Sequence, residues 1–420
     1  MKNPTQIHDT VENKISFGLI AAFIITLPFD RLYSELALIC LFLHAVIHVS
    51  KDKLKSLVNV ENLILSSVFF LTVIGIGWSP DKGQAMKDVQ RQMAILLIPI
   101  IFSLTNLDLY QYKNKILSLL VVTCTATVIY LYADALRIIA YNNLPAKQIF
   151  SPFFLNHNFS APVGIHATYL SMYISLAIAW LLVVLTKEKN RSLQALQTGI
   201  LMLLIAGLLQ LASRAVLFTT IGYVVIVFPI LLPPPFSKIK FLVVSLCLSL
   251  LAILAITQID SYRKRYVVAL QEDLTQTPVN NELLEPRIIR WKIALELIKK
   301  SPVIGYGSGT EKRILKERYF EKKLFNSYIQ ELNSHNQYLS LLLKTGVLGF
   351  AIFIFSLFRG FLAAWSKKDT VFICFLLLIA NVSFSENILD VNKGIFFYAF
   401  FFSLFLKTSK PFTDFTRLKE

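Results

Sequence analysis

The chain has 420 residues and a formal net charge of +16, and 55% of its residues are hydrophobic while only 16% are charged. A soluble chain averages about 25% charged residues. This composition, with a mean hydropathy of +0.59, therefore excludes a soluble enzyme, a disordered protein and a secreted disulfide scaffold. The apolar residues fall in blocks long enough to cross about 30 Å of hydrocarbon. We predict an all-α, polytopic membrane protein.

The apolar blocks predict about twelve transmembrane helices, with the polar N-terminal segment retained rather than cleaved as a signal peptide. In chain order the predicted spans are 15–29, 33–49, 62–78, 92–104, 115–140, 166–186, 195–212, 214–232, 239–257, 336–357, 370–385 and 393–407. No internal repeat is visible, which gives no support to an inverted-repeat transporter. All four cysteines lie inside apolar blocks without a CxxC pair, so neither a disulfide framework nor a zinc site is indicated.

Loop charge sets the expected orientation. With both termini in the cytoplasm, the inside loops carry most of the loop Lys and Arg, as the positive-inside rule requires. The positive net charge is then explained by membrane orientation, and we expect no nucleic-acid partner. This topology predicts a multi-pass membrane protein whose long polar insert lies outside, in the periplasm if the cell is Gram-negative.

One polar insert, residues 258–335, divides the chain into helices 1–257, a periplasmic helical loop, and helices 336–420 with a cytoplasmic tail. Two amphipathic helices are predicted within the insert, over 286–300 and 311–332, and Ser301-Pro302 is expected to end the first. Between them, Gly305, Gly307 and Gly309 resemble a phosphate loop only superficially. They lack the Gly-Lys-Ser/Thr ending, so we interpret them as a turn.

Three candidate catalytic residues are predicted to lie at the outer face. His335 stands where the insert re-enters the membrane, and its ordinary pKa near 6.5 suits proton transfer. Arg214 begins a span, and Arg287 lies on the first insert helix, where both can bind phosphate oxygens. Each also has a simpler interpretation. His335 can be an interfacial polar residue, Arg214 an arginine that snorkels to the interface, and Arg287 part of a solvated helix face.

Further candidates surround these three. Arg290 and Trp291 share the helix of Arg287, His166 begins the sixth predicted span, and Arg91 lies near the outer face with Glu386 and Asp390 as weaker candidates. Lys344 lies on an otherwise apolar helix nine residues beyond His335, and the sequence does not assign its partner. A charge within a membrane helix is a functional hypothesis by default. We interpret His44 with His48 as structural, and we leave Asp134 with Arg137 open as either a functional pair or two charges that neutralise each other.

These residues carry a family resemblance. His335-Asn336, nine residues, Gly346, two residues and Gly349 fit the pattern H-[NSQ]-x9-G-x-x-[GTY] of bacterial O-antigen ligases and related oligosaccharyltransferases. Arg287-x3-Trp291 and Ser213-Arg214 are similar to the regions around the arginines of the same superfamily. The pattern marks the superfamily better than any single member.

The resemblance implies transfer of a glycan from undecaprenyl diphosphate to an acceptor at the periplasmic face, without metal or cofactor. It implies that His335 acts as general base or positions the acceptor hydroxyl, and that Arg214 and Arg287 clamp the diphosphate. Arg290, Trp291, Asn336, His166, Arg91 and Lys344 are then expected to bind substrate. The absence of an Asp-x-Asp motif in the insert agrees with a metal-independent reaction.

The sequence leaves the acceptor open. A ligase uses lipid A-core, which we take as the leading expectation, with membrane lipids as further partners. A Wzy-type polymerase uses a second lipid-linked repeat, and protein-glycosylating members use a Ser or Thr hydroxyl. From different classes, a twelve-span transporter or flippase and a purely structural membrane scaffold remain as alternatives that would not need His335.

Overall fold

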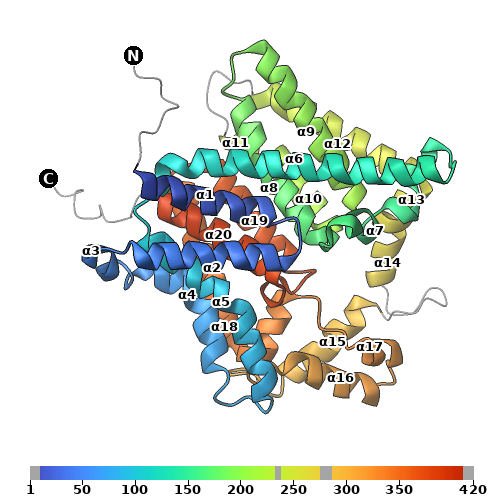
Figure 1. Cartoon of the computed structure of the whole chain (residues 1–420). Coiled ribbons are helices and arrows are strands. Elements are labelled where there is room, and N and C mark those ends of the chain that lie inside the picture. The colour runs from blue at the N-terminus through green and yellow to red at the C-terminus, as the bar shows by residue number, and fades with distance from the viewer. Residues whose placement is uncertain (1–9, 232–237, 275–285, 410–420) are drawn as a thin grey trace.

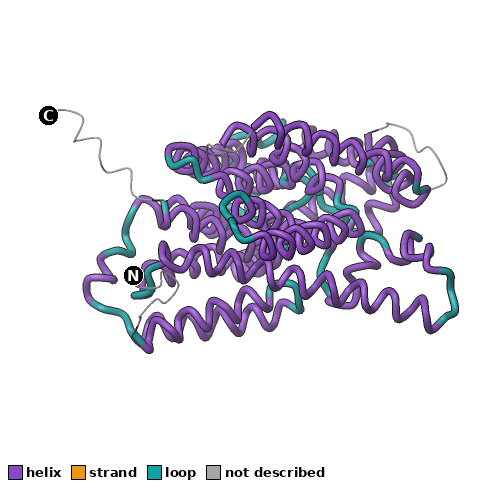
Figure 2. The backbone as a smooth tube through the Cα atoms, turned by 90° about the horizontal axis from the view of Figure 1, so that it is seen from above, coloured by secondary structure: helices purple, strands orange, loops and turns teal. Residues whose placement is uncertain are grey.

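The computed structural model describes residues 10–231, 238–274 and 286–409. Residues 1–9, 232–237 and 410–420, which fall in predicted cytoplasmic segments, and 275–285 of the insert lie outside these ranges. Throughout the described ranges the chain is helix or loop, without a strand (Figure 2). This confirms the all-α prediction.

A helix lies at each of the twelve predicted spans. The first seven are α1 (Val11–Thr26), α2 (Arg31–Ile47), α4 (Val60–Ile74), α5 (Lys82–Leu104), α6 (Leu109–Tyr141), α8 (Ala167–Leu185) and α9 (Arg191–Leu211). The eighth span is α10 (Arg214–Gly222), η4 (Tyr223–Val227) and α11 (Phe228–Leu231) in succession. The remaining four are α12 (Lys238–Gln258), α18 (Gln337–Ser366), α19 (Thr370–Val382) and α20 (Asn392–Thr408).

Within the described ranges, five helices are long and apolar enough to cross a membrane: α6, α8, α9, the α10 to α11 segment, and α18. The count of twelve spans therefore stays a prediction. Helix α5 differs most from its predicted span, 92–104, because it begins ten residues earlier. The Asp81 side chain caps this start by accepting from the backbone of Gln84. The extra turns carry Asp88 and Arg91, so their polar face needs a polar environment.

Short elements connect these helices. They are α3 (Lys51–Lys55), η1 (Ala146–Phe150), η2 (Pro152–Phe154), α7 (His157–Ser160), η3 (Ala161–Val163) and η6 (Ile388–Asp390). The predicted insert contributes α13 (Asp260–Arg263), η5 (Lys264–Val268), α14 (Ala269–Leu274), α15 (Arg287–Ile298), α16 (Glu311–Glu321) and α17 (Phe325–Ile329). Figure 1 shows α15, α16 and α17 together at one corner of the molecule, beside α18.

The core is built around α20, whose residues are almost all buried. Its sequence from Ile395 to Leu406 is apolar on every side, which is typical of a helix enclosed by others. Phenylalanine rings dominate the packing, and Phe375 of α19 contacts the rings of Phe397, Phe401 and Phe405. This core fixes α5, α6, α8, α18 and α19 around one axis.

Polar contacts define two ends of the bundle. At one end, which we call the Asp369 end, Lys113 pairs with Asp369 and Lys407 donates to Asn62. At the other, the His335 end, Lys393 contacts Ser34. Helix α1 begins and α20 ends at the Asp369 end, away from the predicted site. Which end faces the periplasm stays a prediction.

The first predicted insert helix is confirmed as α15, which ends just before Ser301-Pro302. The second, predicted as one helix over 311–332, is wrong as a single element. Lys323 adopts a left-handed backbone with φ +59°, which ends α16 and separates it from α17. Buried side chains of α15 and α16, among them Leu297 and Leu315, pack on Leu343 of α18. The insert thus folds against the helix that follows His335.

The glycine-rich turn packs on a break in α18. At Gly346 the backbone has φ +65°, and Val347 N donates to Pro302 O across the break at 2.9 Å. A Cβ atom on Gly346 would lie 2.1 Å from Val303 O. The backbone of Gly307 donates to Lys344 O at 2.9 Å. The turn interpretation is supported, because these glycines permit close backbone packing against α18.

Candidate active site

Arg214 and Arg287 meet at a single carboxylate. Helix α9 ends at Leu211. The next residue, the buried Ala212, has φ +48°, and this turn places Arg214 at the start of α10. Its guanidinium lies 2.5 Å from Asp273 Oδ2, and Arg287 Nε lies 3.6 Å from the same oxygen. Arg287 also donates to Ser385 O at 3.1 Å. Two arginines that are distant in sequence therefore share one polar site.

A third arginine, which the sequence interpretation missed, belongs to the same group. Arg265 lies on η5, and its pKa is lowered by burial and by the nearby charges of Arg214 and Arg287, against the opposing effect of Asp273. The guanidinium still remains cationic at physiological pH. The run Arg263-Lys264-Arg265 was the available signal, but only the fold shows which of its members turns inward.

His335 lies beside this arginine group. Its Nδ1 atom is 3.6 Å from Glu386 Oε2, and Glu386 follows Ser385, the residue bound by Arg287. This spacing is too long for a hydrogen bond, and the two groups form an ion pair only when His335 is protonated. Burial acts to raise the pKa of Glu386, but His335, His166 and Arg287 outweigh it and lower that pKa, so the carboxyl stays ionised. The three predicted catalytic residues therefore converge at the His335 end.

The backbone of His335 is held in an uncommon conformation. Its φ is +46°, in the left-handed region that costs a residue other than glycine about 1–2 kcal/mol. The His335 N–H donates to Asn333 Oδ1 at 3.0 Å. Such a conformation persists only where the surroundings impose it, and it clusters at functional sites.

Residues of α15 hold the segment that precedes His335. Trp291 Nε1 donates to Ser334 O at 2.9 Å, and the buried Arg290 reaches Asn333 O at 3.5 Å. Asn336 caps α18, because its side chain accepts from the backbone of Tyr338 and Leu339. The structure thus places these three predicted substrate-binding residues in contact with the chain around His335.

His166 lies close enough to Glu386 for their charges to interact. It caps α8, and its ring centroid is 3.9 Å from that of His157. Desolvation, with the nearby charges of His166 and Arg265, lowers the pKa of His157 to about 4. Desolvation and the charge of His335 also lower the pKa of His166, against the opposing effect of Glu386. These two histidines are therefore neutral at physiological pH. Nδ1 of His157 accepts from Ala167 N and Nδ1 of His166 accepts from Thr168 N, so Nε2 of each neutral ring carries the hydrogen and can donate it to a ligand.

A polar cavity of about 670 Å³ opens beside these histidines. Three predicted substrate-binding residues, His166, Arg91 and Lys344, all line it. Its walls also carry carboxylates, amides and an aromatic ring, from Asp88, Glu311, Asp390, Gln84, Asn333, Asn392 and Tyr169. Its volume falls within the usual range of small-molecule sites.

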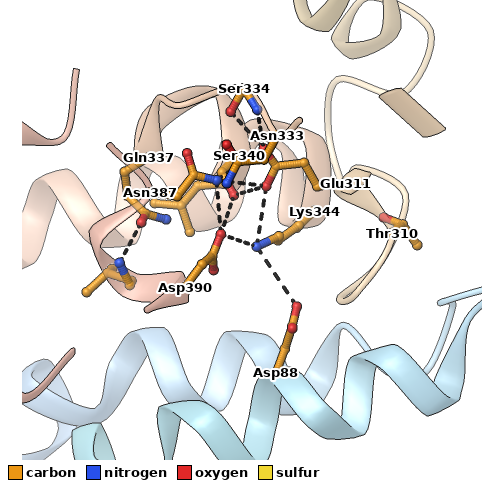
Figure 3. A network of polar contacts seen from close by, with 12 residues as sticks. Asp88, Thr310, Glu311, Asn333, Ser334, Gln337, Ser340, Lys344, Asn387 and Asp390 are labelled. Carbon is orange, nitrogen blue, oxygen red and sulfur yellow. Dashed lines mark hydrogen bonds and ion pairs between the residues drawn. The ribbon is translucent and has the colours of Figure 1, made fainter. Parts of the chain in front are cut away.

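Lys344, which the sequence left without a partner, has several (Figure 3). Its Nζ lies 2.7 Å from Asp390 Oδ2, 3.5 Å from Glu311 Oε2 and 4.0 Å from Asp88 Oδ2. Asp88 pairs also with Arg91 at 3.2 Å. Three carboxylates thus share two cations, which leaves one negative charge in excess.

The pKa shifts of the two aspartates reflect that excess. Burial raises the pKa of Asp88 by more than Lys344 lowers it. Burial also acts to raise the pKa of Asp390, but Lys344 and the Asn387 amide outweigh it and lower that pKa. Asp390 is therefore the ionised partner of Lys344, while Asp88 is the group that takes up a proton more readily.

Other singled-out residues lie elsewhere. The rings of His44 and His48 are tilted against each other with centroids 4.3 Å apart near the Asp369 end, where His44 contacts Glu12 O. Arg137 pairs with Asp134 at 2.7 Å on α6, as the structural interpretation allowed. Within the described ranges, no group of three or more His, Cys, Asp or Glu side chains is arranged to hold a metal ion.

These helices and this site define an integral membrane protein with a charged polar site at one end of its helix bundle. Residues 199–354 match the family described as O-antigen ligase, and this range contains Arg214, Arg287 and His335. The resemblance expected from the sequence is thereby confirmed, and the match supports an O-antigen ligase-like family for the chain. No curated protein matches the chain.

Proposed function

We propose that this protein is a glycosyltransferase of the O-antigen ligase type that moves a glycan from undecaprenyl diphosphate to a hydroxyl of lipid A-core. The observation that carries this proposal is the meeting of Arg214, Arg287 and His335 at one end of the bundle, inside the matched region. The membrane helices suit a lipid-linked donor. The site then faces the periplasm of a cell whose inner membrane holds the protein.

The donor binds through its diphosphate. Arg214 and Arg287 already hold one carboxylate between them, and guanidinium groups bind phosphate oxygens by paired, charge-assisted hydrogen bonds. Arg265 adds a third positive charge. As the glycosidic bond breaks, negative charge accumulates on the leaving diphosphate, and fixed cations aimed at that charge lower the barrier.

His335 activates the acceptor hydroxyl. Its Nδ1 faces Glu386, which leaves Nε2 as the ring nitrogen for an acceptor hydroxyl. The hydroxyl oxygen forms a bond to the anomeric carbon while its proton passes to His335. The bond from that carbon to the diphosphate oxygen breaks, and undecaprenyl diphosphate leaves with the electron pair. A single direct displacement inverts the anomeric carbon.

The polar cavity next to His166 suits the acceptor sugar. Its carboxylates, amides and Arg91 offer hydrogen-bond partners for hydroxyl groups, and Tyr169 contributes aromatic surface. Both positive and negative side chains line this cavity, in contrast to the arginine group that we assign to the diphosphate. Donor and acceptor then approach His335 from two sides.

The test uses the purified chain in nanodiscs with an undecaprenyl diphosphate-linked oligosaccharide and rough lipopolysaccharide, in the presence of EDTA. We expect a lipopolysaccharide ladder on a gel, lost in His335→Ala and kept in His48→Ala, a matched histidine change near the Asp369 end. Extension of the lipid-linked donor alone would instead identify a polymerase. Transfer that persists in His335→Ala, or no transfer to lipid, protein or repeat-unit acceptors, would overturn the proposal.

A further inference from the structure

The two residues that flank His335, Ser334 and Asn336, are tied to one buried pair of side chains, Glu311 and Asn387. Ser334 N donates to Glu311 Oε1 at 3.0 Å, and the Ser334 hydroxyl donates to the same oxygen at 2.7 Å. On the other flank, Asn336 N donates to Asn387 Oδ1 at 2.8 Å. The chain is therefore held immediately before and after His335.

Glu311 and Asn387 also bind each other. Asn387 Nδ2 lies 3.1 Å from both carboxylate oxygens of Glu311. Ser340 of α18 adds a hydroxyl at 2.5 Å from Glu311 Oε2. Figure 3 shows these groups converging from α16, α18 and the segment before α20. A carboxylate that accepts this many hydrogen bonds has one defined orientation.

The charge of Glu311 requires compensation because its side chain is only 3% exposed. A buried carboxylate is stable only when it is paired and hydrogen-bonded. Lys344, 12% exposed and 3.5 Å away, supplies the opposite charge. Lys344 is itself anchored at 2.7 Å by Asp390, to which Asn387 also donates at 3.0 Å. The cluster is thus a closed network.

We propose that Glu311, bound to Asn387 and neutralised by Lys344, is the positioning group that imposes the left-handed backbone of His335 and aims its imidazole at the acceptor hydroxyl. This inference rests on the proposed function. None of the three residues needs to touch the reacting atoms. The network explains why an otherwise apolar stretch of α18 carries a lysine nine residues after His335.

The experiment measures kcat and the donor KM for transfer in Glu311→Gln and Lys344→Met. A displaced general base slows the chemical step, so we expect kcat to fall by about 10- to 100-fold. The donor KM should change little, because the diphosphate binds at Arg214 and Arg287. Lys344→Arg should restore part of kcat. Lys407→Met is the control, because it removes another buried lysine far from His335, at the Asp369 end.

Two smaller substitutions distinguish the positioning of His335 from a general loss of protein stability. Ser334→Ala and Ser340→Ala each delete one hydroxyl that binds Glu311, yet only Ser334 adjoins His335. We expect the larger loss of kcat in Ser334→Ala. These small changes keep the test usable even if Glu311→Gln fails to fold.

Coupling to His335 gives the decisive comparison. In a His335→Ala background, Glu311→Gln should cause no further loss of residual transfer, because residues that act as a unit are not additive. Equal losses in both backgrounds, or wild-type kcat in Glu311→Gln and Ser334→Ala while His335→Ala is inactive, would overturn the positioning role alone. Transfer that does not depend on His335 would overturn the proposed function instead.

Discussion

The guanidinium of Arg214 and the carboxylate of Asp273, 59 residues apart, form an ion pair at the position where we expect the donor diphosphate. Both side chains are largely shielded, with 13% and 26% exposure. Asp273 contacts both Arg214 and Arg287 through one carboxylate oxygen. Under the proposed function, the donor diphosphate takes the place of this carboxylate between the two arginines.

This exchange predicts that Asp273→Asn lowers the donor KM. An ion pair of this kind contributes on the order of 1 kcal/mol, so we expect a decrease of about 3- to 10-fold. The measurement is initial transfer rate against donor concentration. Asp260→Asn is the matched control, because Asp260 forms an exposed pair with Arg263 at 3.0 Å. A donor KM that rises in Asp273→Asn would show that Asp273 is needed to arrange the arginines.

The arginine pair predicts a steep and metal-independent loss of activity on truncation. Removing one fixed donor to developing negative charge typically costs about 10²- to 10³-fold in kcat, so we expect about that loss for Arg214→Ala and for Arg287→Ala. Lysine at either position should restore only part of the lost kcat, because it lacks the planar guanidinium group with which arginine forms paired hydrogen bonds. EDTA should leave the wild-type rate unchanged.

Arg137→Ala is the control for these variants, because Arg137 pairs with Asp134 on an exposed face of α6. If Arg214→Ala transfers glycan at the wild-type rate, the diphosphate does not bind where we place it. If EDTA abolishes wild-type transfer, a metal ion shares the task that we assign to the arginines.

The break in α18 predicts that Gly346→Ala destabilises the fold. The added Cβ would meet Val303 O at 2.1 Å and Ile304 N at 2.6 Å, and the backbone there has φ +65°. We expect a loss of at least about 2 kcal/mol, measured as a lower unfolding temperature in detergent.

Gly199→Ala offers the opposite outcome in the same assay. Gly199 lies inside α9, and no atom lies within 4 Å of the position that an alanine Cβ would take there. Alanine should therefore be neutral or stabilising by up to about 1 kcal/mol. Equal unfolding temperatures for the two variants would contradict the close packing of α18 on the turn at Pro302.

The histidine pair predicts a stability change with pH. Burial lowers the pKa of His157 from 6.5 to about 4, so the unfolded chain binds a proton there more readily than the folded chain between these values. Stability should therefore fall as the pH drops from 6.5 to about 4. His157→Asn should reduce this slope, measured by unfolding temperature at each pH. Identical slopes in both proteins would contradict this prediction.

Short-range sequence patterns predict much of the fold. Apolar blocks predict a helix at each span, and Ser301-Pro302 correctly ends α15. Such signals depend on residues within a few positions of one another, because helix geometry repeats about every 3.6 residues. The same locality explains the error over 311–332, where apolar spacing continues past Lys323 although the backbone turns left-handed there.

The candidate site was predictable as a set of residues but not as an arrangement. Residue type and pattern single out His335, Arg214 and Arg287, since proton transfer and phosphate binding need those groups. Their approach to one another depends on how α10, α15 and α18 pack, and on Asp273, which carries no signal of its own. Arg265 was missed because the run Arg263-Lys264-Arg265 does not show which of its members lies near Arg214 and Arg287.

The sequence by itself therefore determined a helical membrane protein, its family resemblance and the chemical groups available to it. Only the tertiary structure decided which of these groups are partners. Lys344 joins Asp390 across 46 residues, and Glu311 binds Ser334 across 23. Charge pairing inside a protein acts over a few ångströms, so the relevant neighbours are those that helix packing brings together.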